Sequence, residues 1–326
     1  MSTQRTQSRP KALVGIDIGG TKTAVVLSET PPDLVWRKEF PTLPADGPDH
    51  AVRSIIELTR EALRESQSLP SAIGVSCGGP LDRSKGIIQC PPNLWTWDDV
   101  PIKQILEDEF AVTCYVENDA NAGAIAEHRF GAGQGCRHMI FLTLGTGLGA
   151  GLILNDRIYH GATGMAGEIG HVRLTETGPS GFGKTGSVEG WASGGGMAQR
   201  AQELAAAAAR GGERTYLSGT ASTITARDVG IALASGDPLA ERIVGETGLR
   251  LGEALAILVD LLNPERIVLG GLALRLGEAL LGPARLRVQQ EALQQSSDVC
   301  EIIPAALGER IGDVAALCVA MGLSDA

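Results

Sequence analysis

The sequence predicts an α/β protein with two lobes of similar design that face each other across a cleft. Two stretches, residues 13–27 and 139–154, each indicate a strand, a glycine turn and a second strand. After each of them, apolar segments of strand length alternate with segments of helical periodicity. The chain has 326 residues, enough for two domains of about 150 residues each.

The same pattern indicates where the lobes divide. We expect a disordered lead-in at residues 1–10, a smaller first lobe at 11–117 and a larger second lobe at 118–310. The lead-in is polar and basic and lacks the apolar segment of a signal peptide. A last helix is predicted at 311–323. We expect it to return to the first lobe, so that residues 311–326 join that lobe.

Composition favours a soluble cytoplasmic protein. With 43% hydrophobic and 20% charged residues, the chain can bury a sizeable core. The formal net charge of −10 argues against nucleic acid as a partner, because phosphate neutralisation requires clustered Lys and Arg. The six cysteines are scattered without a C-x-x-C pair, which fits a reducing compartment. The longest uncharged stretch, 139–155, is too short and glycine-rich to span a membrane.

The glycine turn of the first hairpin, Gly19-Gly20, is a candidate anion site. Glycine permits positive φ, and its backbone N–H groups can approach a phosphate closely. A plain β-hairpin would show the same pair. Asp17 is the unusual residue, because a carboxylate among apolar strand positions is costly to bury without a partner. A Mg²⁺ ion or its bound water would be such a partner.

Asn118 and Asp119 stand where a predicted strand at 113–116 gives way to a predicted helix at 121–129. Open α/β sheets bind ligands at the carboxyl ends of their strands. Both residue types are also ordinary helix N-caps, so the pair alone could be a cap. The other predicted elements of this lobe are strands at 34–40 and 71–76, helices at 49–66 and 101–110, and a rigid turn at 91–94 that presents the Asn93 amide.

The second hairpin carries the turn Gly145-Thr146-Gly147, so a phosphate chain could lie between two glycine turns. Its G-x-G-x-G spacing runs into a strand rather than a helix, which excludes a dinucleotide-binding motif. Further on, Gly270-Gly271 follows a strand and would let the backbone approach a flat ring. The other predicted elements are helices at 194–210 and 237–262 and strands at 267–269 and 300–304.

Two motifs lie between these elements. Residues 178–185 have the P-loop spacing G-x-x-x-x-G-K-[ST], but no apolar strand precedes them and no helix follows. We therefore expect Lys184 not to bind nucleotide. Glu168 and His171 are three residues apart and would share one face of a helical turn, with Glu189 beyond the loop. A lone histidine is more often structural, so this group needs support from its neighbours.

Together these motifs resemble the ROK (repressor, open reading frame, kinase) family, whose enzymes are sugar kinases with the two-lobed actin-like ATPase (ribonuclease H-like) fold. The resemblance covers nearly the whole chain from Leu13. It rests on Asp17-x-Gly-Gly-Thr-Lys22, Glu117-Asn-Asp-Ala-Asn121, Leu144-Gly-Thr-Gly-x-Gly149 and Gly167-Glu-Ile-Gly-His171, in this order. It implies a cytoplasmic homodimer that uses ATP and Mg²⁺ to phosphorylate a hexose or N-acetylhexosamine, with the glucose 6-hydroxyl as the leading acceptor.

The resemblance also implies roles for individual residues. Asp119 is expected to be the base that takes the proton from the sugar hydroxyl, a task that suits a carboxylate in a cleft. Sugar hydroxyls are expected to be held by Asn93, Asn118, Glu168, His171 and Glu189. The phosphates are expected along Gly19, Gly20, Thr21, Lys22, Gly145, Thr146 and Gly147, the adenosine near Gly270 and Gly271, and Mg²⁺ near Asp17 through water.

The chain departs from the family at a structural zinc site. ROK kinases usually carry C-x-C-G-x-x-G-C-x-E after the family histidine, and those three thiolates bind zinc together with that histidine. Here the cysteine positions hold Ser180, Phe182 and Ser187, which are poor zinc ligands or none. We therefore predict no zinc. The loop at 176–188 must then be ordered by apolar packing of Phe182 or by bound sugar, or stay mobile.

Two functional interpretations follow. Many ROK members are repressors with a helix-turn-helix module, but only about a dozen residues precede Leu13, too few for that module. We therefore expect a kinase. The alternative is a sugar-sensing protein that has lost turnover, suggested by the absent thiolates. The intact acidic residues and His171 favour the enzyme, and the sequence leaves the identity of the sugar open.

Overall fold

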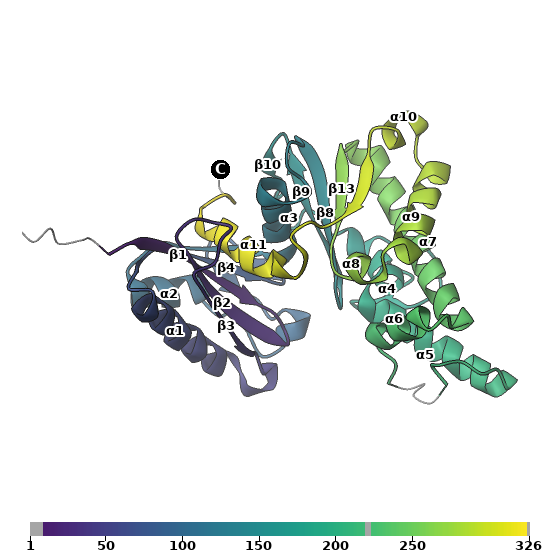
Figure 1. The fold of residues 1–326 in the computed structure, drawn as a ribbon, viewed down its shortest axis with the longest axis horizontal. Helices are drawn as coiled ribbons and strands as arrows, with labels where there is room; N and C mark the ends of the chain where they lie inside the picture. Colours follow the sequence, from purple (N-terminus) through teal and green to yellow (C-terminus); the bar gives the residue numbers. More distant parts are fainter. Residues whose placement is uncertain (1–8, 219–222, 325–326) are drawn as a thin grey trace, which may run out of the picture. The chain divides into compact units, whose positions relative to one another are not determined.

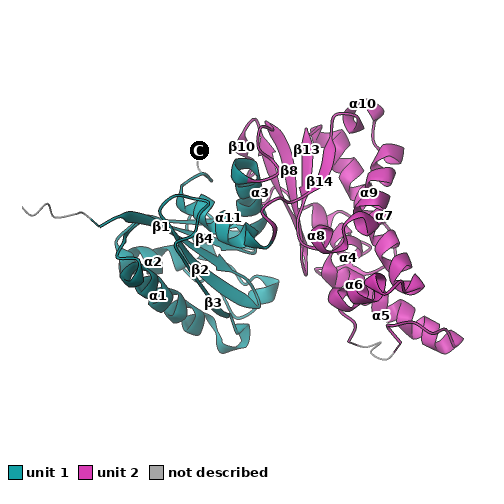
Figure 2. Cartoon of the chain, in the orientation of Figure 1, with its two compact units in different colours: residues 1–130, 309–326 teal, residues 131–308 magenta. Residues whose placement is uncertain are grey.

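The computed structural model describes residues 9–218 and 223–324, so nearly all of the lead-in expected at 1–10 lies outside the described residues. The chain divides into two compact units (Figure 2). Unit 1 comprises residues 1–130 and 309–326, and unit 2 comprises residues 131–308. Residues 118–130, expected in the second lobe, therefore lie in unit 1.

Unit 1 is built on a five-stranded sheet in the order β3-β2-β1-β4-β7 (Figure 1). β1 (Lys11–Ile18) and β2 (Lys22–Ser28) form the expected antiparallel glycine hairpin, and β3 (Trp36–Pro41) extends it. β4 (Leu69–Cys77) lies parallel to β1, and β7 (Cys114–Asn118) lies parallel to β4. The apolar runs in β1 and β4 suit strands that are buried on both faces.

Helices cover both faces of this sheet. α1 (Pro48–Glu65) and α2 (Ile102–Phe110) contribute to a core with the apolar residues of β1, β2 and β4. α11 (Ile311–Ala320) packs on β1 and β4 and against α3 (Asp119–Phe130). A Cβ at Gly74 would lie 2.1 Å from the backbone nitrogen of Ala320, so glycine is required where α11 crosses β4.

Unit 2 repeats the design of the first sheet. β8 (His138–Leu144) and β9 (Leu148–Leu154) form the second antiparallel glycine hairpin. β13 (Arg266–Leu269) lies parallel to β8, and β14 (Glu301–Pro304) lies parallel to β13. With the short β10 (Arg157–Ile158), the order is β10-β9-β8-β13-β14.

The longest described helix of unit 2 is α7 (Pro238–Leu262), which shares one apolar core with the sheet. It starts at Asp237, whose carboxylate accepts hydrogen bonds from the N–H groups of Leu239 and Ala240, and it ends at Asn263 with a φ of 44°. Both ends are typical helix caps. The remaining helices include α4 (Val188–Ala192), α5 (Gly194–Gly211), α6 (Ala226–Ala234), α8 (Leu272–Leu276), α9 (Glu278–Glu291) and α10 (Gln294–Ser297).

The predicted α/β class is confirmed, and both predicted hairpins and both predicted long helices of the second half are present. The last helix ends at Ala320 rather than at 323, followed by a turn. Within the described ranges, no helix is long and apolar enough to cross a membrane.

Candidate functional site

The first glycine turn and Asn93 lie side by side in unit 1. The turn is closed by a hydrogen bond from the Gly19 N–H to the Lys22 carbonyl oxygen at 3.0 Å. A Cβ added to Gly20 would lie 2.5 Å from the Cβ of Asn93, on η2 (Pro92–Leu94), so a side chain at residue 20 would displace Asn93. Lys22 is exposed and pairs with Glu39 at 3.2 Å. The structure thus brings one predicted sugar residue next to the predicted phosphate turn.

Asp17 lies near the end of β1, in a strongly acidic environment. Burial, followed by the nearby carboxylates of Asp119 and Asp313, raises its pKa to about 7, and Lys22 and a hydrogen bond with Ser76 only partly oppose this rise. A Cβ on Gly312 would lie 2.2 Å from Asp17 Oδ2, so the backbone of α11 directly adjoins this carboxylate. Asp313 and Gly312 come from the other end of the chain, and no local sequence signal connects them to Asp17.

Asn118 and Asp119 form the junction of β7 and α3, as expected. The Asn118 Oδ1 accepts hydrogen bonds from the backbone N–H groups of Ala120, at 2.9 Å, and Asn121, at 3.3 Å, so Asn118 does act as a helix cap. Asp119 is exposed, and its Oδ1 accepts from the Ala120 N–H at 2.9 Å. The cap and the candidate site are therefore compatible, because the cap leaves the other Asp119 oxygen available.

The pKa of Asp119 is raised from its ordinary value, chiefly by desolvation, while backbone hydrogen bonds oppose the rise. We expect water to screen much of this shift, since the side chain is exposed. A carboxyl group with a raised pKa is a better proton acceptor than an ordinary one, provided that it stays ionised near neutral pH.

Glu117 was not predicted as a site residue, yet it supports the Asn118–Asp119 junction. It is 1% exposed, and its Oε2 accepts a hydrogen bond from Arg83 Nε at 2.8 Å. Its Oε1 accepts from the Asn118 N–H and from Asn121 Nδ2, at 2.9 and 3.1 Å. A glutamate inside an apolar strand was the available sequence signal, because such a charge requires a partner.

In unit 2, Glu189 lies against the second glycine turn. Its Oε2 accepts a hydrogen bond from the Leu148 N–H at 3.0 Å, and a Cβ on Gly147 would lie 2.8 Å from the same oxygen. The carbonyl oxygens of Gly145 and Thr146 accept hydrogen bonds from the first N–H groups of α5, at 2.7 and 3.0 Å. The turn is therefore fixed from two sides.

Glu168 precedes the short helix η3 (Ile169–His171) and His171 is its last residue, and both side chains are exposed. The His171 N–H donates to the Glu168 carbonyl oxygen at 3.1 Å. A Cβ on Gly170 would lie 3.5 Å from the Cβ of Glu189, which places this segment beside Glu189. The three predicted sugar residues of unit 2 thus belong to one local region.

The Gly270-Gly271 turn also meets the end of β8. The Gly270 N–H donates to the Leu142 carbonyl oxygen at 2.9 Å, and a Cβ on Gly271 would lie 2.1 Å from the Leu144 oxygen. With a φ of 57° at residue 271, glycine is required both for conformation and for space. The turn therefore lies one residue from the Gly145–Gly147 turn along β8.

Residues 178–185 do not adopt the geometry of a P-loop. They contain the hairpin β11 (Ser180–Gly181) and β12 (Lys184–Thr185) instead of a loop that opens a helix. Lys184 Nζ donates a hydrogen bond to the His171 carbonyl oxygen at 2.6 Å. This lysine is therefore engaged with the predicted sugar region of unit 2.

The residues near Asp17 suit Mg²⁺, whereas those at the family's zinc position do not suit zinc. Within the described part of the chain, no group of three or more His, Cys, Asp or Glu side chains could hold a metal ion. Mg²⁺ commonly uses only one or two carboxylates together with phosphate oxygens and water, so the oxygen donors around Asp17 suit it. Ser180, Phe182 and Ser187 do not suit zinc, since they supply no thiolate or imidazole.

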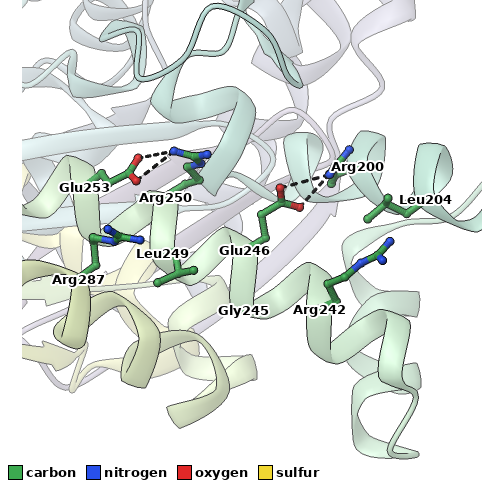
Figure 3. A pocket seen from close by; sticks show the side chains of 9 residues that line it. All are labelled: Arg200, Leu204, Arg242, Gly245, Glu246, Leu249, Arg250, Glu253 and Arg287. Atoms are coloured by element: carbon green, nitrogen blue, oxygen red, sulfur yellow. Dashed lines mark hydrogen bonds and ion pairs between the residues drawn. The ribbon is translucent and has the colours of Figure 1, made fainter.

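A separate groove of about 680 Å³ lies along α5, α7 and α9 (Figure 3). Two of its four arginines pair with its two glutamates: Arg200 pairs with Glu246 and Arg250 pairs with Glu253, both at 2.9 Å. Arg200 and Arg250 also lie over the ring of Trp191. The groove contains none of the predicted site residues. Its lining residues are Arg200, Leu204, Arg242, Gly245, Glu246, Leu249, Arg250, Glu253 and Arg287.

Comparison with known proteins gives a consistent result. The ROK family model matches residues 13–322. The chain is 35% identical to a glucokinase of Halalkalibacterium halodurans over 92% of each chain. It resembles a solved ROK family glucokinase from Streptomyces griseus, in complex with glucose and AMPPNP, with a TM-score of 0.80 and 30% identity over 95% of this chain and 99% of that one.

Related repressors are also similar to this chain. The regulator NagC of Escherichia coli is 28% identical over 94% of this chain and 74% of its own length.

A ROK hexokinase from Thermus thermophilus has a TM-score of 0.78 and 32% identity, covering 97% of this chain and all of that one. These likenesses confirm the two-lobed actin-like ATPase fold.

Proposed function

The chain belongs to the ROK family, and from this we propose that it is an ATP-dependent kinase of a hexose or N-acetylhexosamine, with the glucose 6-hydroxyl as the leading acceptor. The observation that carries the proposal is the pair Asp17 and Asp119 in unit 1. Their negative charges interact, the pKa of each is raised above its ordinary value, and within the described residues neither forms an ion pair. Such an unfavourable arrangement is typical of functional sites.

In the proposed reaction, Asp119 accepts the proton of the sugar hydroxyl while the oxygen of that hydroxyl forms the new bond to the γ-phosphorus of ATP. The bond from that phosphorus to the β,γ-bridging oxygen breaks, and ADP leaves. The other sugar hydroxyls are held by Asn93, Asn118, Glu168, His171 and Glu189. General-base assistance of this kind contributes about 10²–10⁴-fold to rate.

The glycine turns serve the nucleotide in this proposal. The turns at Gly19–Thr21 and Gly145–Gly147 line the phosphates, Lys22 adds positive charge, and Gly270-Gly271 lies against the adenosine. Asp17 would hold Mg²⁺ through water, and the ion would supply positive charge to the phosphates. We also propose that the protein is a cytoplasmic homodimer; sedimentation of the purified protein tests the assembly.

A coupled assay of ADP release tests the proposal directly. The panel is glucose, mannose, fructose, N-acetylglucosamine and N-acetylmannosamine, each with MgATP. We expect turnover with at least one of them, and product analysis of the active sugar identifies the phosphorylated hydroxyl. Binding of a sugar without ADP release from any of them overturns the kinase proposal.

That second outcome would select the alternative, a sugar-sensing protein without turnover. The similarity to NagC and to a xylose repressor, 27% identical over 96% of this chain, favours that alternative. The intact Asp119 favours the kinase, since a sensor needs no general base.

A further inference from the structure

The hairpin β11–β12 contacts His171 at two points, through its turn and through its second strand. The Phe182 ring meets the His171 ring edge to face, with centroids 5.1 Å apart and planes at 86°. Lys184 Nζ donates a hydrogen bond to the His171 carbonyl oxygen at 2.6 Å. One contact holds the imidazole ring and the other holds the backbone of the same residue.

The turn of this hairpin is unusual in its sequence. Phe182 has a φ of 45° and Gly183 a φ of 73°, so both central residues of the two-residue turn have positive φ. That conformation strongly prefers Asn-Gly or Asp-Gly, and a bulky aromatic residue is strained there. Phe182 is also 61% exposed, so burial does not explain its presence. The favourable interaction that Phe182 makes from this strained position is its ring contact with His171.

The base of the hairpin is anchored independently of any metal. Gln199 of α5 makes a reciprocal pair of hydrogen bonds with the Ser180 backbone, at 3.1 and 2.8 Å. The hydroxyl groups of Ser180 and Thr185 pair across the strands at 3.0 Å. Ser187 Oγ accepts a hydrogen bond from the Gly190 N–H and so caps α4, the helix that carries Glu189.

We propose that Phe182 and Lys184 form a metal-free clamp that positions His171 for the sugar, in place of the zinc that the family resemblance implies. Ser180, Phe182 and Ser187 cannot supply zinc ligands, and each has another role in the structure: strand pairing, ring contact and helix cap. The clamp residues are positioning residues, because they act on the sugar through His171. This inference rests on the proposed function for its effect on catalysis, but not for its effect on His171 itself.

The variant Phe182→Asn gives the sharpest test, because it creates the preferred Asn-Gly turn while it removes the ring. If Phe182 only stabilised the hairpin, this variant would be unchanged or improved in every respect. We expect Tm to be equal or higher, whereas KM for the sugar rises about tenfold and kcat and KM for ATP change less than about threefold. Lys184→Met should raise KM for the sugar in the same way and leave KM for ATP unchanged. Tyr216→Ala, which removes another exposed aromatic ring of unit 2, is the matched control.

Nuclear magnetic resonance of the imidazole protons, without sugar or nucleotide, tests the clamp separately from the kinase activity. In Phe182→Asn the His171 signals should move, because the ring current of Phe182 is lost, and Tyr216→Ala should leave them in place. Elemental analysis should show well under one zinc per chain, and a zinc chelator should leave Tm and sugar KM unchanged. Unmoved His171 signals in Phe182→Asn, an unchanged sugar KM in an active kinase, or stoichiometric zinc overturns the clamp. Moved signals in a protein without turnover support the clamp and refute the proposed function.

Discussion

At the scale of single residues, the carboxylate of Asp17 lowers the free energy of unfolding of the protein when it is ionised. Its carboxyl group has an ordinary pKa of 3.8, which burial and two neighbouring carboxylates raise to about 7 in the folded chain. Between these two pH values the folded state binds a proton that the unfolded state does not. The free energy of unfolding contributed by this group therefore falls as pH rises from about 3.8 to about 7.

The variant Asp17→Asn should consequently be more stable than the wild type at pH 8, and its gain should be less than half as large at pH 5, where only the first part of the loss has occurred. Because Asp17 is partly exposed, we expect a modest gain, of about 1–2 kcal/mol at pH 8, or roughly 2–6 °C in Tm. Thermal unfolding at both pH values, without Mg²⁺ or nucleotide, measures the difference. A gain that is the same at pH 5 and pH 8 would show that charge is not its origin.

Asp119 differs from Asp17 because its carboxylate is exposed and held by the first turn of α3. Asparagine has nearly the same shape but cannot accept the proton, so Asp119→Asn should lower kcat by about 10²–10⁴-fold. The circular dichroism spectrum and Tm should change little. Single-turnover kinetics with the active sugar measure the effect, and a variant that keeps more than about a tenth of the wild-type rate would exclude Asp119 as the base.

At the scale of elements, the cap of α7 makes an instructive test. Asp237 is 4% exposed, and its carboxylate accepts hydrogen bonds from Leu239, Ala240, Tyr216 and Thr215. Asp237→Ala removes all of them, and we expect a loss of about 2–3 kcal/mol in the free energy of unfolding. Thr225→Ala, at the exposed cap of the short α6, should cost about 1 kcal/mol or less. Chemical denaturation of both variants compares them, and equal losses would contradict this account.

Elements with strong local signals could be predicted from sequence, and the others could not. The glycine hairpins and α7 combine apolar periodicity with recognisable turns or caps. α9 has Pro283 inside it, which conceals a helix from a pattern-based prediction. The hairpin at 180–185 was missed because its turn is Phe-Gly rather than Asn-Gly. The capping box at Thr225 and Asp228 was a local signal that could have located α6.

Some residues of the candidate site could likewise be predicted from the sequence, and others could not. Asp17, Asp119 and the glycine turns carry motifs that a sequence shows directly. The neighbours that set the pKa of Asp17, or that hold Glu117 and His171, come from distant segments. Arg83 and Asp313 acquire their roles only through tertiary packing, so no local pattern could have identified them. The absent thiolates did single out Phe182, but not its contact with the His171 ring.

At the scale of the whole molecule, the chain leaves unit 1 after Phe130 and returns to it at Glu309. Each unit has its own apolar core, and α11 supplies one face of the unit 1 sheet with side chains such as Val314 and Leu317, both 0% exposed. Burying each such side chain contributes about 1.5–3 kcal/mol. Unit 1 therefore depends on residues that follow unit 2 in the chain, whereas unit 2 is continuous in sequence.

This organisation predicts how fragments behave. Residues 131–308 should unfold cooperatively on their own, and residues 1–130 should not, because one face of their sheet is uncovered. Joining residues 1–130 to 309–326 through a long Gly/Ser linker should restore a cooperative transition, as measured by calorimetry. Adding Gly74→Val to the joined fragment should abolish it, since a Cβ at that residue would lie 2.1 Å from the Ala320 nitrogen. Cooperative unfolding of residues 1–130 alone would show that α11 is dispensable for the fold of unit 1.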